Sequence, residues 1–176
     1  KNLLMSEDVL SAISIIKKLG IKVNLNRESC EIYGKGLSGF KYKKNTILDA
    51  GNSGTTARLI TAALMNSNHP IKITGDSSLK KRDMMRIIEP LTKFGLLFKK
   101  NKGKLPLIIK GSKYLKPIKY FEKLGSAQCK SAVMIAALFV SGKTFLKCLP
   151  SRNHTEILFK KVLKLSIKIR KKKYHD

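Results

Sequence analysis

The chain has 176 residues, of which 43% are hydrophobic, and carries a formal net charge of +26 at pH 7. This composition supports a packed core and excludes a disordered tail. Because no run of 18 apolar residues occurs and the N-terminus lacks a signal-peptide pattern, we expect neither a membrane span nor a secreted protein.

The cysteines and histidines indicate a reduced, cytoplasmic protein. The three cysteines stand far apart in the sequence, and an odd number argues against a disulfide framework. The three histidines do not cluster with them. We therefore expect no structural metal and no cofactor.

The positive charge is spread along the chain rather than gathered on one element. Of the 37 basic residues only six are arginine, and no aromatic ladder lies between the lysines. Proteins that read bases favour arginine, which binds guanine through two hydrogen bonds. A basic nucleic-acid-binding protein is therefore only an alternative, and we expect the charge to draw small anions toward the protein.

The first predicted elements are a helix and a hairpin. Residues 7–19 carry apolar residues at helical spacing, with Ser6 as a suitable N-cap and Gly20 as a suitable end. Residues 21–25 alternate as a strand, and residues 30–33 form a second strand after a turn.

A loop of small residues, 51–54, then leads into an apolar helix over residues 53–65. Ser53 or Thr55 is suited to cap this helix, and Arg58 lies one turn inside it. Free N–H groups, the helix dipole and a guanidinium would converge there, which predicts an anion site for a phosphate or carboxylate. The buried stripe of the helix is predicted to contain Ala57, Ile60 and Leu64.

Three junctions from helix to strand mark a repeat: Leu19-Gly20-Ile21, Phe94-Gly95-Leu96 and Leu165-Ser166-Ile167. They lie roughly 70–75 residues apart, which is the length of a whole supersecondary unit. The later copies predict helices over 82–94 and 155–165, and strands over 96–98, 105–110 and 167–169.

A second common part lies between these hairpins. The helix over 53–65 is followed by a strand over 71–75, and a helix over 126–139 by a strand over 144–149. Both helices are apolar nearly all round, so we expect them to be buried with sheets outside. The chain starts inside one copy of the unit and stops inside the third, and we expect it to be truncated at both ends.

Equivalent ends of repeated units fall on one face, so four polar loops should meet there. Arginine suits such a face because its planar guanidinium binds carboxylates and phosphates through two hydrogen bonds. The candidate residues are Asn52, Gly54, Arg58, Arg82, Ser126, Ala127, Gln128, Ser151 and Arg152.

Each of these residues also has a purely structural reading. Arg82 would pair with Asp76 or Asp83 on the surface. Serine, threonine and glutamine side chains would only satisfy helix N-termini, as in Ser126, Gln128, Ser151 and Thr155.

Four motifs carry a family resemblance. Residues 48–58, 75–84, 125–131 and 151–156 resemble, in order and spacing, the signatures of the 5-enolpyruvylshikimate-3-phosphate synthases. The UDP-N-acetylglucosamine enolpyruvyl transferases share the repeat but usually lack the second and fourth motifs, and rank as an alternative.

The resemblance implies an α+β fold with two domains, each built as three βαβαββ units around buried parallel helices, an inside-out α/β barrel. This chain would be the N-terminal-side domain, incomplete, with the end of unit one in 1–40, unit two in 41–112 and the start of unit three in 113–176. It implies a monomeric 3-phosphoshikimate 1-carboxyvinyltransferase, a glyphosate target of aromatic amino acid biosynthesis. That enzyme transfers the enolpyruvyl group of phosphoenolpyruvate to the 5-hydroxyl of shikimate 3-phosphate and releases phosphate.

The resemblance also implies roles for individual residues. Arg58 would brace its loop. The phosphoenolpyruvate side would consist of Asn52, Gly54, Arg82 and Gln128. The shikimate 3-phosphate side would consist of Ser126, Ala127, Gln128, Ser151 and Arg152.

Three residues depart from the family pattern: Ser53 replaces alanine, Asp83 replaces proline and Asn153 replaces aspartate. Asp83 would put a negative charge beside Arg82. The family's N-terminal Lys-Ser…Arg segment and the charged groups of its other domain have no counterpart here. Because those groups supply the proton transfers, we expect no catalytic residue in this chain and no turnover by it alone.

Overall fold

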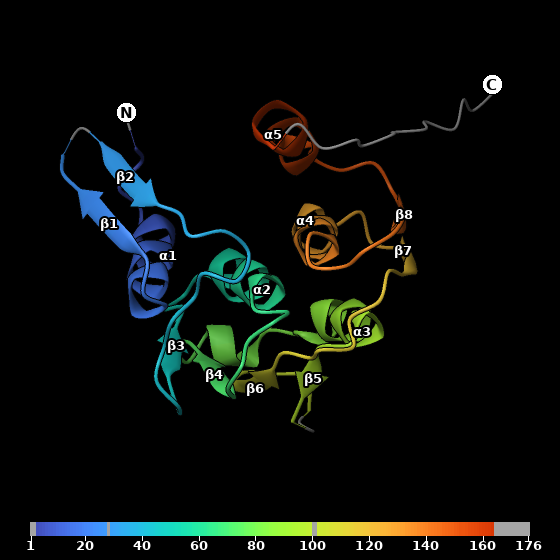
Figure 1. Ribbon diagram of the computed structural model, residues 1–176, viewed down its shortest axis with the longest axis horizontal. Coiled ribbons are helices and arrows are strands. Elements are labelled where there is room, and N and C mark those ends of the chain that lie inside the picture. The colour runs from blue at the N-terminus through green and yellow to red at the C-terminus, as the bar shows by residue number, and fades with distance from the viewer. Residues whose placement is uncertain (1–2, 28, 100–101, 164–176) are drawn as a thin grey trace.

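The computed structural model describes residues 3–27, 29–99 and 102–163 (Figure 1). Its helices are α1 (Glu7–Lys18), α2 (Gly54–Ala63), α3 (Met85–Phe94), α4 (Ala127–Ala137) and α5 (His154–Val162), with a 3-10 turn at Leu79–Lys81. Its strands are β1 (Lys22–Leu25), β2 (Cys30–Tyr33), β3 (Ile47–Asp49), β4 (Ile71–Thr74), β5 (Leu97–Phe98), β6 (Leu107–Lys110), β7 (Lys119–Glu122) and β8 (Phe145–Cys148).

The strands form three separate sheets. Strands β1 and β2 form an antiparallel hairpin, and β7 pairs with β8 in parallel. The third sheet has the order β3-β4-β6-β5, in which only β3 and β4 are parallel. From β3 to β6 the elements follow the order βαβαββ, so the predicted α+β fold class is confirmed, whereas the unit boundaries at residues 40 and 112 stay a prediction.

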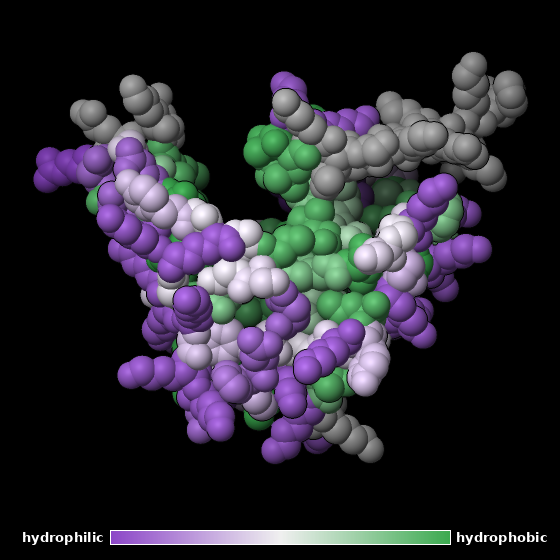
Figure 2. Space-filling model, viewed as in Figure 1, coloured by the Kyte–Doolittle hydropathy of each residue, from purple (hydrophilic) through white to green (hydrophobic). Residues whose placement is uncertain are grey.

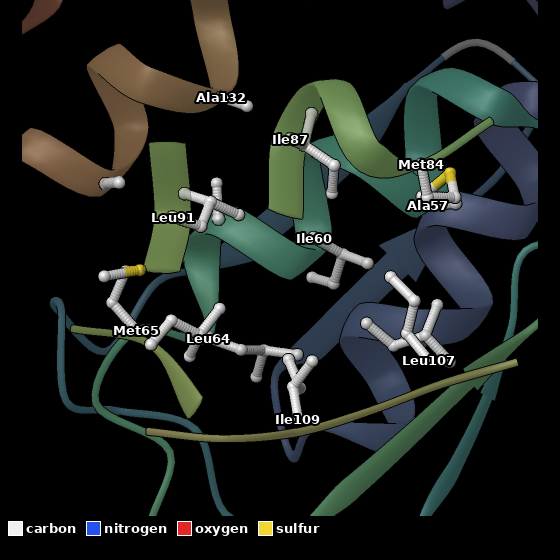
Figure 3. Packing of buried hydrophobic residues seen from close by; sticks show 14 of the residues in the cluster. Ala57, Ile60, Leu64, Met65, Met84, Ile87, Leu91, Leu107, Ile109 and Ala132 are labelled. Atoms are coloured by element: carbon white, nitrogen blue, oxygen red, sulfur yellow. The ribbon is translucent and has the colours of Figure 1, made fainter. Parts of the chain in front are cut away.

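The centre of the molecule is the contact between α2 and α4 (Figure 1). Ala57, Ile60 and Leu64 are all buried, which confirms the predicted stripe of α2. Figure 3 shows these side chains between those of α3 and β6, with Ala132 of α4 nearby. Each fully buried aliphatic side chain contributes about 1.5–3 kcal/mol of transfer free energy, so these faces hold the helices in place.

Two short strands and one helix start differ from the prediction. Strands β3 and β7 were not predicted, because three or four residues beside turn formers give little periodicity. Helix α3 begins at Met85 rather than at residue 82, since Arg82 has an extended backbone and the Asp83 carboxylate accepts the Met85 N–H at 2.8 Å. The strand predicted over 167–169 lies outside the described residues.

The surface differs between the outside of the molecule and its central hollow. Hydrophilic side chains spread over the outside of the face shown in Figure 2, as the diffuse lysines predicted. Apolar side chains face the hollow between the arm of α1, β1 and β2 and the arm of α4 and α5. Within the described residues, no helix has the length and apolar character needed to span a membrane.

Candidate functional site

The loop before α2 is shaped by small residues and one carboxylate. Gly51 has φ +56°, and its N–H donates to the side chain of Asp49 at the end of β3 (2.9 Å). Ser53, the family's alanine position, caps the helix by accepting the Thr56 N–H at 3.1 Å. A Cβ on Gly75 would lie 2.6 Å from the Gly51 carbonyl oxygen, so this close approach of β4 requires glycine.

Asn52 connects this loop to the segment that follows β4. Its amide nitrogen donates to Asp76 Oδ2 (2.6 Å), and its amide oxygen accepts from Arg82 Nη2 (2.9 Å). The Leu79 N–H and then the Asn52 amide hold the pKa of Asp76 below its ordinary value of 3.8. Within the described residues Arg82 has no ion pair with either carboxylate, so the simple surface-pair reading of Arg82 is wrong.

Arg58 joins α2 to α4. Its Nη1 donates to Gln128 Oε1 (2.6 Å) and its Nη2 to the Asp83 carbonyl (3.1 Å), while Gln128 Nε2 donates back to Thr55 Oγ1 (2.6 Å). Burial lowers the pKa of Arg58, yet a guanidinium stays charged at any physiological pH. Arg58 therefore braces Gln128 and the Asp83 backbone, and Gln128 does not act as a simple helix cap.

The carboxylate of Asp83 is directed toward α3 rather than toward Arg82. Besides accepting the Met85 N–H, it lies 3.9 Å from Arg86 Nε. Asp83 thus satisfies the N–H of the first residue of α3, although Met84 is the N-cap position. Its charge acts mainly on the start of α3, where a negative group is favourable.

The loop before α4 repeats the design of the loop before α2. Glu122 ends β7, is 3% exposed, and accepts the N–H groups of Leu124 (3.1 Å) and Ser126 (2.9 Å). Gly125 has φ +64°, and the Ser126 hydroxyl accepts the Cys129 N–H at 3.3 Å. The capping role that the sequence allowed for Ser126 is therefore confirmed.

The segment before α5 and the first turn of that helix are attached to α4 by polar contacts. Lys130 Nζ lies 2.6 Å from Glu156 Oε1 and donates to the Arg152 carbonyl at 2.7 Å. The hydroxyls of Ser131 and Thr155 are hydrogen-bonded at 2.6 Å. The predicted capping of α5 by Ser151 or Thr155 is wrong.

Ser151 and Arg152 keep polar groups that these contacts do not use. The Ser151 hydroxyl is buried and has no hydrogen-bond partner within the described residues. The Arg152 side chain is exposed. Both groups thus remain available in the segment that the family resemblance assigns to a phosphorylated ligand.

The predicted site residues fall into two connected groups. A Cβ on Gly54 would lie 3.0 Å from Arg58 Nη1 and 3.2 Å from Arg82 Nη1, so Gly54 is directly beside both guanidinium groups. Gln128 joins this group through Arg58 and shares the first turn of α4 with Ala127. Ser151 and Arg152 are attached to the next turn of α4 through Lys130.

Sequence reasoning missed Asp49 and Glu122, and it gave Thr55 and Asp76 other roles than their observed bonds to Gln128 and Asn52. The two strand-final carboxylates share a signal that was overlooked, namely an acidic residue shortly before a glycine and a helix cap. No group of three metal-ligating side chains occurs in the part of the chain that the structure describes.

Comparison with known proteins gives consistent matches. The whole chain, residues 1–176, matches the family model of EPSP synthase (3-phosphoshikimate 1-carboxyvinyltransferase). The 3-phosphoshikimate 1-carboxyvinyltransferase of Ruthia magnifica subsp. Calyptogena magnifica is 46% identical over 158 residues, which are 89% of this chain and 36% of the relative. The enzyme of that name from Caldicellulosiruptor saccharolyticus is 42% identical over 163 residues, or 91% of this chain and 37% of the relative.

Solved structures agree with these sequence matches. The EPSP synthase of Acinetobacter baumannii superposes with a TM-score of 0.83 at 34% identity, over 90% of this chain and 36% of that chain. The enolpyruvyl transferase NikO of Streptomyces tendae has a TM-score of 0.54 at 13% identity over 84% of this chain and 31% of its own, and shares the fold alone. This chain therefore spans little more than a third of the length of its curated relatives.

Proposed function

The chain belongs to the EPSP synthase (3-phosphoshikimate 1-carboxyvinyltransferase) family, and from this premise we propose that it serves the family's reaction. In that reaction the enolpyruvyl group of phosphoenolpyruvate is transferred to the 5-hydroxyl of shikimate 3-phosphate and phosphate is released. The observation that carries the proposal is the link through Arg58, which joins the Asn52–Arg82 group to Gln128. The matches to named relatives favour this reading over a UDP-N-acetylglucosamine enolpyruvyl transferase and over a nucleic-acid-binding protein.

Phosphoenolpyruvate would bind beside Gly54, where two guanidinium groups approach the start of α2. Arg82 uses Nη2 to hold Asn52, which leaves further N–H donors for a carboxylate or phosphate. Each charge-assisted hydrogen bond contributes roughly 1.5–3 kcal/mol. Gln128, held between Arg58 and Thr55, would lie between this ligand and the second substrate.

Shikimate 3-phosphate would bind at the start of α4. Ser126 and Ala127 begin this helix, whose N-terminus favours a phosphate. The buried Ser151 hydroxyl and the exposed Arg152 guanidinium supply further donors. The Ser126 hydroxyl accepts the Cys129 N–H, which leaves its own O–H free to donate to the phosphate.

Five carboxylates that neighbour these groups in the described part of the chain are already engaged. Asp49, Asp76, Asp83, Glu122 and Glu156 each accept a hydrogen bond or lie in an ion pair. An addition–elimination needs a general acid and a general base. We therefore propose that the 176-residue chain binds substrate without turnover, and a phosphate-release assay at normal family rates would contradict this.

Thermal unfolding with added ligand tests the binding function. Shikimate 3-phosphate should raise the melting temperature, because a ligand at 100 times its Kd stabilises the folded state by about 2.7 kcal/mol. Shikimate without the phosphate should give a much smaller shift, and so should the Arg152→Ala variant with the phosphorylated ligand. A shift by duplex DNA that falls steeply with salt, and none with shikimate 3-phosphate, would overturn the proposal.

We also propose a cytoplasmic location and a monomeric enzyme. The three cysteines are all free thiols, which suits a reducing compartment. Sedimentation of the reduced protein would test the monomer directly.

A further inference from the structure

Lys130 differs from most of the other lysines because its side chain is only 5% exposed. It lies in the second turn of α4, and both of its contacts reach the segment 151–156. One contact is the ion pair with Glu156, whose side chain is 14% exposed, and the other is the hydrogen bond to the Arg152 carbonyl. Lys130 therefore connects α4 to the backbone of the residue that carries the exposed guanidinium.

Helix α5 has little apolar packing that could hold this segment in place. Phe159 is its only buried residue in the part that the structure describes, whereas Ile157, Leu158 and Val162 are 43%, 54% and 65% exposed. Figure 1 shows α5 beside α4 at the edge of the molecule, away from the four-stranded sheet. The polar contacts of Lys130 and Ser131 are thus the main attachment of the segment before α5.

A buried ion pair contributes little net free energy of folding, because the desolvation of both charges offsets their attraction. Here the pair has a second consequence for the neighbouring arginine. The Glu156 carboxylate and the Arg152 carbonyl both lie within 2.7 Å of Lys130 Nζ, so this carboxylate is close enough to Arg152 to compete for its guanidinium. Because Lys130 engages Glu156, the Arg152 side chain is left exposed and available to a ligand.

We propose that Lys130 is a positioning residue for the phosphorylated substrate. It fixes the Arg152 backbone through the carbonyl and keeps Glu156 from competing for the Arg152 guanidinium. This inference rests on the proposed function, since it assigns Arg152 to the anion of shikimate 3-phosphate. Lys130 itself touches no substrate.

Three variants of the 176-residue chain separate positioning from stability. Lys130→Met removes the charge at similar length, the double variant Lys130→Met/Glu156→Leu removes the buried pair without leaving an unpaired charge, and Lys160→Met on the exposed face of α5 is the matched control. Calorimetry should show an affinity for shikimate 3-phosphate about 10-fold lower in Lys130→Met, the loss expected for a charge-assisted hydrogen bond. The double variant lacks the competing carboxylate and should lose less, but it should still bind more weakly than the wild type because the Arg152 carbonyl is no longer held. The affinity for phosphoenolpyruvate should stay unchanged, as should both affinities in the control.

The melting temperature separates positioning from a purely structural role, because under a structural role the affinity would fall and recover together with it. Lys130→Met should lower it, and the double variant should recover most of the loss, because replacing both partners by apolar groups is often neutral. A double variant that recovers wild-type affinity together with its melting temperature would overturn the proposal.

Hydrogen exchange of the ligand-free chain tests the attachment independently of binding. The amides that donate to the first turn of α5, beginning with that of Ile157, which donates to the Asn153 carbonyl, should lose protection in both Lys130 variants, while those of α2 keep theirs. Equal protection in all variants, or equal loss throughout the molecule, would contradict the attachment. If the wild-type chain does not bind shikimate 3-phosphate, the proposed function fails, and exchange alone then decides whether Lys130 fixes this segment.

Discussion

The starts of α2 and α4 are two versions of one local structure. In each, a strand ends in a carboxylate that accepts loop N–H groups, Asp49 after β3 and Glu122 after β7. Each loop then contains a glycine with positive φ, Gly51 at +56° and Gly125 at +64°, and each helix is capped by a serine. The repeat therefore preserves the backbone geometry that presents a helix N-terminus to an anion.

The two versions differ in how the neighbouring arginine-bearing segment is held. After β4, Arg82 is followed by α3, which buries Ile87, Leu91 and Phe94 completely in the apolar core. After β8, Arg152 is followed by α5, which is attached mainly through the buried pair of Lys130 and Glu156. The helix after the arginine is thus held by apolar packing in one copy and by a buried ion pair in the other. The stability of the protein should therefore respond differently to substitutions in α3 and in α5.

The largest expected effect comes from the same substitution made on α3 and on α5. Leu91→Ala should cost about 2–5 kcal/mol of unfolding free energy, because it leaves a cavity in the packed core. Leu158→Ala on the exposed side of α5 should cost less than about 0.5 kcal/mol. Urea unfolding of both variants measures the difference, and similar losses would show that α5 packs as tightly as α3.

A smaller loss of stability is expected from removing Arg58, which joins the start of α2 to the start of α4. Arg58→Met should cost about 2 kcal/mol, since charge-assisted bonds to Gln128 and to the Asp83 carbonyl are lost in a half-buried position. Arg86→Met is the control, because its pair with Asp83 is exposed and should contribute about 0–1 kcal/mol. A double-mutant cycle with Gln128→Ala should give a clear coupling energy, and additive losses would argue that the link is not formed in solution.

A third test changes only the loop and helix start at α2, through Gly54. In Gly54→Ala the new Cβ would lie 3.0–3.2 Å from the two guanidinium groups, so both must move by a few tenths of an ångström. We expect the phosphoenolpyruvate affinity to fall about 10-fold, or about 1.4 kcal/mol, with fold stability unchanged or higher, since alanine suits a helix better than glycine. Gly34→Ala, which meets no atom within 4 Å, is the control. Unchanged calorimetric affinity would place the ligand elsewhere.

The smallest expected effect is a pH dependence at Asp76. Its pKa is lowered in the folded state, so its hydrogen bonds stabilise the loop above about pH 3.8, and this contribution is lost as the pH falls through the lowered pKa. Asp76→Asn should flatten the fall in melting temperature at acidic pH, while at neutral pH it changes little, because the group is exposed. Parallel melting curves for both proteins from pH 6 to pH 2 would refute a role for this carboxylate.

Much of the fold was predictable because its signals are local. Apolar periodicity and end residues located five helices to within a few residues, and the small-residue loops located the candidate site. The failures have tertiary causes. Strand β3 is recognisable only from its pairing of Leu48 with Ile73 of β4. Besides the local bond from Asp83 to Met85, the start of α3 has a tertiary contact, in which the Met84 N–H donates to the Gly103 carbonyl.

The sequence by itself determined the repeat, the two glycine loops and the residue types suited to anions, because turn geometry and helix capping depend on neighbouring residues. Only the tertiary structure decided which of those residues meet. The bond from Arg58 to Gln128 spans 70 positions, and the buried Lys130 meets Arg152 and Glu156 only because the chain returns to α4. Periodicity cannot reveal such pairings, since they depend on how separate elements pack and on which polar groups lose water in doing so.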